Sequence, residues 1–337
     1  MRLARAARAV YGADVPPPIV HHPDYEAQIA PGHRFPMAKY RHLRAALARR
    51  GLITPGEGPA PGAASAALLS LAHDPGYVSR AFALALTDAE QRRIGLPRHP
   101  AMLRRARLAA AGTVMTAEYA LSAGIACNTA GGSHHARWAG GAGFSTFNDV
   151  AIAARALLAA GRIRRALVVD CDVHQGDGTA EIFAADERVF TVSLHAAKNF
   201  PLRKEASDLD VALPDGLEDA GYLDALDQAL DAALAAGPFD LAFYNAGVDV
   251  HREDRLGRLA LTDDGIAARD ALVLSRLRDA DFPVAAVIGG GYGADAAIIA
   301  ERHALLFEAA AARWAAERSG PAPHGGAHAA ALARSTP

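Results

Sequence analysis

Residues 170–178 read Asp-Cys-Asp-Val-His-Gln-Gly-Asp-Gly and directly follow the apolar run at 166–169. In an extended segment side chains alternate between two faces, so Asp170, Asp172 and His174 point to the same side. Carboxylates and an imidazole that converge at the end of a buried strand are usual ligands of a divalent metal ion. Structural zinc sites are closed and rich in cysteine, whereas this set indicates a catalytic site with an open coordination position. The pattern predicts a metalloenzyme.

Polar groups also follow four other strand-like runs of the sequence. These groups are His134 and His135 after two glycines, His195, Asp249, and Tyr292 in the run Gly-Gly-Gly-Tyr-Gly. In open parallel sheets the active site lies outside the carboxyl ends of the strands. We therefore expect these groups to meet the carboxylates of residues 170–177 at one edge of a sheet.

The two adjacent histidines are suited to acid–base chemistry beside a metal. Imidazoles that are not ligands can serve as general base and general acid for a bound water. A catalytic histidine needs a partner on its second nitrogen, and Asp170 and Asp177 are candidates for that role. Asp177 stands between two glycines, so a plain turn residue is the alternative interpretation.

Asp249 and Tyr292 add a candidate ligand and a candidate hydrogen-bond donor. Asp249 ends an apolar run and is either one more metal ligand or the cap of the next element. The glycines around Tyr292 lack the lysine of a phosphate-binding loop and the spacing of a dinucleotide fingerprint, which argues against nucleotide binding. A tyrosine on such a platform is suited to donating its hydroxyl to a developing oxyanion.

The composition gives no sign of a membrane or nucleic-acid partner. The chain has 337 residues, 51% of them hydrophobic, and a formal net charge of −2. That charge gives no electrostatic reason to expect nucleic-acid binding, and no run of about 18 apolar residues predicts a membrane span. Cys127 and Cys171 are the two cysteines and cannot form a disulfide framework. We expect buried free thiols and a reducing, cytoplasmic location.

Alternating strand and helix patterns predict an α/β protein, a three-layer αβα sandwich around a parallel sheet. The predicted strands are 19–20, 124–129, 166–170, 189–194, 241–246 and 283–289, and the predicted helices are 37–50, 100–122, 150–160, 217–236, 262–280 and 294–315. Thr262 is the predicted N-cap of one helix, and Gly161 and Gly237 end two others.

The domain prediction is a single catalytic domain at 17–317 between a flexible N-terminal extension at 1–16 and a flexible tail at 318–337. The arginine-rich start of the chain fits either a targeting segment or a disordered extension.

Taken together, the motifs resemble those of the zinc-dependent histone deacetylase superfamily. In order, they are Gly-Gly-Ser-His134-His135-Ala, Gly143-Phe144-Ser-Thr-Phe-Asn148-Asp149, the run 170–178, Asn-Ala-Gly-Val-Asp249 and Gly-Gly-Gly-Tyr292. The segments 33–37 and 199–204 are most similar to the bacterial members allied to class IV. The resemblance implies the arginase/deacetylase fold with a largely parallel eight-stranded sheet.

The resemblance also implies ligands for two ions. One catalytic zinc, or iron(II) in its place, would be bound by Asp172, His174 and Asp249. A structural potassium ion would be surrounded by Asp170, Asp172, His174, Ser193 and Leu194.

The remaining motif residues receive roles toward the substrate from the same resemblance. His134 and His135 would pair with Asp170 and Asp177 respectively, and His135 would be the general base and acid. Tyr292 would polarise the scissile carbonyl. The tunnel for a linear acylated amine would be lined by Gly143, Phe144 and Phe200. Ser145 stands where many members have cysteine, which should alter packing at the tunnel floor more than the chemistry.

Several activities stay open at this point. Removal of an acetyl or longer acyl group from acyl-lysine in a protein is the leading interpretation, and hydrolysis of an acetylpolyamine or another small amide is the alternative. A non-catalytic acyl-amine binding module is disfavoured because the ligands, the histidine pair and the tyrosine are all present. A two-manganese ureohydrolase is disfavoured because further paired aspartates are missing. The acyl-chain length and the oligomeric state are undetermined.

Overall fold

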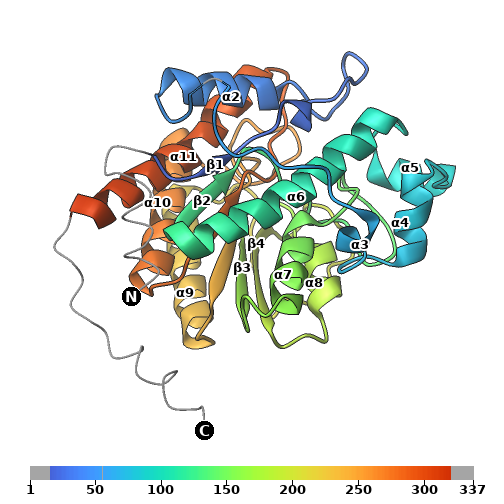
Figure 1. Cartoon of the computed structure of the whole chain (residues 1–337). Coiled ribbons are helices and arrows are strands. Elements are labelled where there is room, and N and C mark those ends of the chain that lie inside the picture. Colours follow the sequence, from blue (N-terminus) through green and yellow to red (C-terminus); the bar gives the residue numbers. More distant parts are fainter. Residues whose placement is uncertain (1–15, 55, 320–337) are drawn as a thin grey trace, which may run out of the picture.

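A seven-stranded sheet with helices on both faces forms the centre of the structure, a computed structural model that describes residues 16–54 and 56–319 (Figure 1). The flexible termini predicted at 1–16 and 318–337 lie outside the described residues, apart from Pro16, Arg318 and Ser319. The last two belong to the final helix, which therefore continues past the predicted domain end at residue 317.

All neighbouring strands of the sheet are parallel, in the order β1-β2-β7-β6-β3-β4-β5. Their bounds are β1 (Ile19–Val20), β2 (Ile125–Asn128), β3 (Ala166–Asp170), β4 (Val189–Ala196), β5 (Leu209–Leu213), β6 (Leu241–Asn245) and β7 (Val284–Val287). Six of the seven strands were predicted. The exception, β5, is an edge strand whose residues are mostly exposed or half-buried, so it lacks the continuous apolar run that marks the others.

The eight strands implied by the resemblance are not present in the described residues, which contain seven. Residues 58–61 pass along the outer side of β1, where the His21 N–H donates to the Pro59 carbonyl at 3.1 Å. Pro59 and Pro61 have no N–H to donate, so this segment cannot extend the ladder as a further strand. The predicted strand count is wrong for this part of the chain, while the predicted fold class is confirmed.

The helices form a layer on each face of the sheet, as predicted for a three-layer sandwich (Figure 1). One layer contains α2 (Lys39–Arg49), α9 (Asp219–Ala235), α10 (Asp263–Asp279) and α11 (Ala296–Ser319), and the other contains α6 (Pro100–Ala123), α7 (Asp149–Ala159) and α8 (Asp177–Phe183). Beyond them lie η1 (Pro23–Tyr25), α3 (Ala66–Leu69), α4 (Pro75–Phe82) and α5 (Asp88–Ile94). The helices of one or two turns were not predicted because such short segments show little periodicity.

Local capping explains where several helices begin and end. The Thr262 hydroxyl accepts a hydrogen bond from the Gly265 N–H at 3.0 Å, which confirms the predicted N-cap of α10. Gly161, with φ of 64°, lies just after α7 in a left-handed conformation that glycine adopts without strain. Asn148 caps α7 by accepting from the Ala151 N–H at 3.0 Å, so the helix starts beside the histidine motif.

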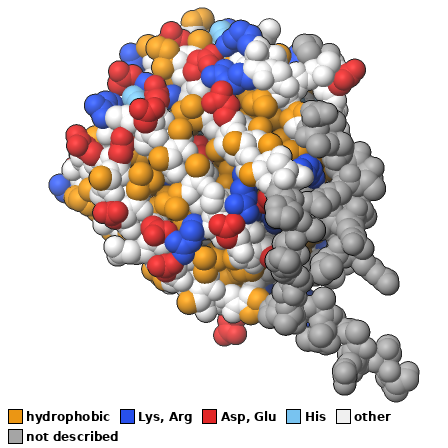
Figure 2. Space-filling view, turned by 90° about the vertical axis from the view of Figure 1, so that its left-hand side faces the viewer, with side chains coloured by type: hydrophobic (Ala, Val, Ile, Leu, Met, Phe, Trp, Pro, Cys, Tyr) orange, Lys and Arg blue, Asp and Glu red, His pale blue; other side chains and the backbone are white. Residues whose placement is uncertain are grey.

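No helix among the described residues has the length and apolar character to cross a membrane. On the left-hand face of Figure 1, acidic and basic side chains are scattered among apolar ones (Figure 2). Arg50, directly after α2, pairs with two residues of α11, Glu301 at 2.7 Å and Glu308 at 2.5 Å. Ion pairs thus join the end of α2 to α11.

Candidate metal-dependent active site

Asp172, His174 and Asp249 converge just beyond the carboxyl ends of β3 and β6. One ligand atom from each side chain can be chosen so that all three lie within 4.8 Å of one another. The His174 Nδ1 atom is 3.0 Å from an Asp172 oxygen and 3.1 Å from an Asp249 oxygen, and all three residues are buried. A donor set of one imidazole and two carboxylates fits a catalytic divalent ion.

Backbone N–H groups fix the two carboxylates of this triad. The Gly290 N–H donates to Asp172 at 2.7 Å, and the Val173 N–H donates to Asp249 at 2.9 Å. A Cβ atom at Gly290 would lie 2.1 Å from an Asp249 oxygen and 2.6 Å from an Asp172 oxygen, so only glycine fits there. The glycine run that the sequence places before Tyr292 thus forms one wall of the metal site.

The electrostatics of the triad favour a bound cation. Burial and the neighbouring charge of Asp172 raise the pKa of Asp249 to about 6. Burial acts in the same direction on Asp172, but His134 and His174 outweigh it and hold the pKa of Asp172 well below its usual range. Two buried carboxylates that share one imidazole repel each other, and a divalent ion between them would remove that repulsion.

The two adjacent histidines form separate dyads with the two predicted carboxylates. His134 Nδ1 lies 2.6 Å from Asp170 Oδ2, and His135 Nδ1 lies 2.6 Å from Asp177 Oδ1. In both dyads the second ring nitrogen is left for other partners, and His134 Nε2 is 3.7 Å from an Asp172 oxygen. Asp177 is thus a histidine partner, and the alternative interpretation as a plain turn residue does not hold.

The pKa values of the two histidines shift in opposite directions. Burial lowers the pKa of His134, but the charges of Asp170 and Asp172 outweigh burial and raise it to about 9. Burial and the neighbouring His134 lower the pKa of His135 to about 4, despite the carboxylate of Asp177. At neutral pH His135 is therefore the uncharged imidazole of the pair and is able to accept a proton.

Each dyad has its own support, which the sequence did not reveal. Asn245 donates to Asp170 at 2.9 Å from the end of β6. Arg137 donates to the second oxygen of Asp177 at 2.8 Å and also contacts Glu181 and Glu205, at 2.5 and 2.7 Å. Neither residue could be found from sequence, because Arg137 and its acidic partners are up to 68 positions apart.

The loop that carries the histidines is held by the start of α7 and by a buried histidine. Asp149 accepts hydrogen bonds from the Gly132 and Ser133 N–H groups at 3.2 and 2.7 Å. His73, which no sequence motif marks, lies 2.9 Å from the Arg137 carbonyl and accepts from the Asn148 N–H at 2.9 Å.

A cavity of about 350 Å³ leads to the dyads and is lined by aromatic residues. The ring of Phe144 packs 5.5 Å from that of Phe35 and 5.7 Å from that of Tyr292. Tyr292 in turn lies 6.1 Å from the His174 ring, beside the metal triad. Tyr292 thus lines the cavity with its ring close to the triad.

The predicted tunnel residues lie at this cavity, although only some of them line it. Gly143 and Phe144 are lining residues, as is Ser145. Phe144 has a φ of 63°, an uncommon conformation for a residue with a Cβ, held by its N–H bond to the Ile94 carbonyl at 2.7 Å. Phe200 is 45% exposed with its ring 4.8 Å from the His135 ring, so it lies at the mouth.

The residues named for potassium lie together at the β3–β4 pair, and His195 lies apart from the dyads. Asp170 is directly opposite Ser193 in the parallel ladder, and Leu194 follows on the same strand. Asp170 Oδ1 accepts from the Asp172 N–H at 3.1 Å. His195 lies 3.1 Å from the Ser193 hydroxyl and does not line the catalytic cavity, so that strand end does not contribute to it.

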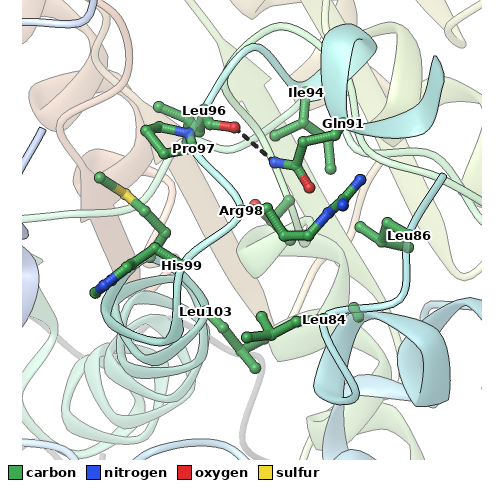
Figure 3. Close-up of a pocket in the computed structure, with 12 residues that line it drawn as sticks. Leu84, Leu86, Gln91, Ile94, Leu96, Pro97, Arg98, His99 and Leu103 are labelled. Atoms are coloured by element: carbon green, nitrogen blue, oxygen red, sulfur yellow. Dashed lines mark hydrogen bonds between the residues drawn. The ribbon is translucent and has the colours of Figure 1, made fainter. Parts of the chain in front are cut away.

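A second cavity of about 360 Å³ lies between α4, α5 and the start of α6. Its lining is mostly apolar, and the Gln91 amide donates to the Leu96 carbonyl within it at 2.6 Å (Figure 3). Arg98, whose side chain lies across this cavity, pairs with Asp88 at 2.8 Å. Ile94, whose carbonyl accepts the Phe144 N–H, is among its lining residues, and no lining residue has a carboxylate, so the candidate metal site belongs to the first cavity.

Comparison with known proteins shows the family. The family model for the histone deacetylase domain matches residues 33–306, and the chain therefore belongs to the histone deacetylase family. It is 49% identical to an uncharacterized protein of Picosynechococcus sp., and the alignment covers 87% of this chain and 98% of that protein.

Named relatives match over a shorter region. Histone deacetylase 2 of Arabidopsis thaliana is 33% identical over 54% of this chain and 48% of the relative. An acetylpolyamine amidohydrolase of Burkholderia pseudomallei is 34% identical over 47% of this chain and 48% of the relative. The matched region thus spans about half the length of each of these two relatives. The HD domain of HDA15, known from a crystal structure, has the same fold, with a TM-score of 0.72 at 22% identity over 87% of this chain and 90% of that one.

Proposed function

We propose that this protein is a zinc-dependent amidohydrolase that removes an acetyl or longer acyl group from the side-chain amine of acyl-lysine in a protein or peptide. The observation that carries the proposal is the placement of two histidine–carboxylate dyads beside a buried Asp-His-Asp triad at an aromatic cavity. The segments 33–37 and 199–204 support a place among the bacterial members allied to class IV.

Asp172, His174 and Asp249 would hold the metal. When bound, a divalent ion supplies a Lewis acid that polarises an amide carbonyl and acidifies water. Zinc suits this mixed nitrogen and oxygen donor set, and iron(II) is the second candidate. Potassium beside Asp170, Ser193 and Leu194 would be a structural cation that stabilises the end of β3.

The two dyads would move protons on the substrate side of the metal. His135, neutral at pH 7, takes a proton from the attacking water and later delivers one to the leaving amine. Asp177 orients the His135 ring through Nδ1, and Arg137 holds Asp177 from the other side. His134, held by Asp170 through Nδ1, would stabilise the developing oxyanion.

Tyr292 and the aromatic residues would position the scissile amide. The Tyr292 hydroxyl would donate a hydrogen bond to the carbonyl oxygen, because its ring lines the cavity and lies near His174. Phe144 and Phe200, on either side of Gly143, form a narrow apolar passage for a linear alkyl chain. A Cβ at Gly143 would lie 2.4 Å from the His135 ring, so glycine is required for the close approach of that ring.

The experiment described below also tests two alternatives to acyl-lysine hydrolysis. An acetylpolyamine or another small amide is a second candidate substrate, since a relative with that named activity matches about half of this chain. A binding module without catalysis would retain the cavity but hydrolyse nothing. A reducing, cytoplasmic location agrees with two buried free thiols, Cys127 and Cys171.

The test is amine release from acetyl-, octanoyl- and myristoyl-lysine peptides and from acetylspermidine, with metal content measured in the same sample. Hydrolysis that a hydroxamate chelator inhibits is expected, and the preferred substrate identifies the acyl length. Absence of hydrolysis by protein that holds one metal per chain would contradict the proposal and favour the binding module. The Asp249→Asn variant is the matched control, since it should lose both metal and turnover.

A further inference from the structure

Arg269 of α10 is a buried cation that does not line the catalytic cavity. Its helix belongs to one of the two layers that cover the sheet (Figure 1). Burial would lower the pKa of Arg269, but the charge of Asp270 outweighs burial and holds this pKa well above its usual range. Burying a charge is unfavourable unless the group is paired and hydrogen-bonded, so the partners of this guanidinium are informative.

One nitrogen of the guanidinium, Nη1, donates to both loops that carry the candidate metal ligands. It lies 3.3 Å from the Cys171 carbonyl and 2.5 Å from the Gly247 carbonyl. Cys171 directly precedes Asp172, and Gly247 stands two residues before Asp249. A single side chain therefore joins the carboxyl ends of β3 and β6 next to the triad.

The two peptide units that contain these carbonyls are held from both sides. The peptide unit before Asp172 donates its N–H to Asp170 Oδ1 at 3.1 Å. The peptide unit after Gly247 donates its N–H to the Gly290 carbonyl at 2.8 Å. Because a peptide unit is planar, its N–H and carbonyl groups turn together. Rotation of either unit would therefore break a hydrogen bond on each side, including the one to the guanidinium.

The two ligand loops are also in direct contact. A Cβ atom at Gly247 would lie 2.6 Å from an Asp172 oxygen and 2.7 Å from Asp172 Cα. Glycine at this position allows the backbone of one loop to approach the carboxylate of the other. The guanidinium thus spans the place where the spacing between Asp172 and Asp249 is set.

Asp270 and Tyr244 compensate the charge of the guanidinium. Asp270 Oδ1 lies 3.0 Å from Arg269 Nε and 2.9 Å from Nη2, and it accepts a hydrogen bond from the Tyr244 hydroxyl at 2.5 Å. All three side chains are buried. The ion pair is formally neutral, so it supplies hydrogen-bond donors to the ligand loops without a net positive charge that would repel a divalent ion.

We propose that Arg269 is a positioning residue for the metal site: its guanidinium ties the loop of Asp172 to the loop of Asp249 and thereby raises the affinity of the site for a divalent ion. This inference rests on the proposed metal-dependent function and adds a residue that touches neither the ion nor the substrate. Replacing a partner of this kind typically lowers metal affinity or activity about 10–100-fold.

A role in folding alone is the alternative, because breaking a buried ion pair also destabilises a protein. The two roles change different quantities. A folding role lowers the free energy of unfolding of the metal-free chain and leaves the metal affinity of the folded chain as it was. A positioning role lowers the metal affinity of a variant that still folds.

The experiment measures the zinc affinity of the full chain by competition with a chromogenic chelator, together with denaturant unfolding of the metal-free samples. The main variant is Arg269→Met/Asp270→Asn, which removes both charges and so leaves none buried without its partner. Its asparagine keeps an acceptor for the Tyr244 hydroxyl. Arg269→Lys is the conservative variant, which retains the charge but replaces the planar fork with a single nitrogen.

Arg165→Met is the matched control, because Arg165 makes the same kind of bridge at the opposite edge of the sheet. Its Nη1 donates to the carbonyls of Ala236 and Pro238 at 3.1 and 3.4 Å. Arg165 directly precedes β3, and Ala236 and Pro238 lie before β6. The control thus removes a guanidinium that joins the amino ends of the same two strands.

The double variant is expected to unfold cooperatively and to bind zinc about 10–100-fold more weakly than the wild-type chain. Arg269→Lys should lie between the two, and Arg165→Met should bind zinc as the wild-type chain does. Wild-type zinc affinity in the double variant would overturn the inference, and so would an equal loss in Arg165→Met. If the double variant does not fold, wild-type affinity in Arg269→Lys would overturn it instead. A wild-type chain that binds no zinc would overturn the proposed metal-dependent function, and the inference with it.

Discussion

The two histidine dyads have the same geometry and different surroundings. In each, a histidine Nδ1 lies 2.6 Å from an aspartate oxygen, and all four side chains are buried. The first dyad, His134–Asp170, is next to Asp172 of the candidate metal triad, and Asn245 donates a hydrogen bond to Asp170. The second, His135–Asp177, adjoins Phe200 at the mouth and is held by Arg137.

This difference in surroundings separates the protonation states. Two negative charges near His134 raise its pKa to about 9, while His135 has the positive His134 as a neighbour and a pKa lowered to about 4. In the second dyad, Arg137 compensates part of the Asp177 charge that would otherwise stabilise a protonated His135. A hydrogen-bonded carboxylate alone therefore does not decide the charge of a histidine, because the next neighbours contribute as much.

The largest effect should come from removing the neutral histidine. His135→Asn is expected to lower kcat about 10³-fold, within the range for loss of a general acid–base, with metal content unchanged. His134→Asn should cost less, because its proposed role is electrostatic. Steady-state kinetics and metal analysis of both variants measure the two decreases in kcat. A decrease in His134→Asn as large as that in His135→Asn, or larger, would contradict the division of roles.

The described ring contacts of Tyr292 are with Phe35, Phe144 and His174 and not with the dyads, so its replacement should leave the protonation of the dyads unchanged. Tyr292→Phe deletes one hydrogen-bond donor to the oxyanion and should lower kcat about 10²–10³-fold. The matched control is Tyr77→Phe, a buried tyrosine whose hydroxyl bonds to the Thr146 carbonyl at 2.8 Å. Wild-type turnover in Tyr292→Phe would remove this residue from the mechanism.

Arg137 distinguishes the second dyad from the first, and its loss should affect the rate rather than substrate binding. Arg137→Met is expected to lower kcat about 10-fold with little change in KM, as for other groups that orient a functional residue. Arg137→Lys should recover part of the rate, since a single ammonium can still reach Asp177. Arg155→Met, which removes a guanidinium 2.8 Å from Asp186 on the far side of α8, should keep the rate. Parallel changes in KM for all three variants would point to general destabilisation.

The sequence indicated the groups of both dyads but not their supports. The spacing of Asp170, Asp172 and His174 on one strand end is a local pattern, and local alternation brings such residues together in any extended segment. The contacts of Asn245, Arg137 and His73 join positions from 40 to 75 apart, so they depend on tertiary packing that one sequence does not display.

The strands, like the site residues, were predicted where a local pattern marks them and missed where none does. Buried strands with continuous apolar runs were predicted, whereas β5 was missed because its exposed edge needs no such run. The eighth strand came from the resemblance, and prolines at 59 and 61 explain why the outer side of β1 does not continue the ladder.

His73 is a third buried histidine, and it differs from His134 and His135 because its described hydrogen-bond partners are backbone groups and not carboxylates. Burial lowers its pKa to about 4 from the ordinary 6.5, similar to that of His135. Above pH 6.5 it is neutral in the folded and unfolded chains alike. Between pH 6.5 and 4 the imidazole of His73 is protonated in the unfolded chain and not in the folded chain. The free energy of unfolding therefore decreases as the pH is lowered from 6.5 to 4, by up to roughly 3 kcal/mol.

His73→Gln should flatten this part of the stability curve. Denaturant unfolding at pH 7.5 gives the difference in free energy of unfolding that is due to the hydrogen bonds lost in the variant. The additional difference that develops between pH 7.5 and 5 is due to protonation of His73 in the unfolded wild-type chain. An identical slope in variant and wild-type protein would assign the pH dependence to other histidines, such as the half-buried His21, whose pKa burial also lowers to about 4.

The decisive measurement is a metal titration of the stripped protein, with turnover of the best acyl-lysine peptide recorded at each addition. Turnover should rise with the divalent metal and saturate at one ion per chain, and Asp249→Asn should neither bind the ion nor turn over. Full turnover without metal, or one bound ion per chain without hydrolysis of any acylated amine, would contradict it.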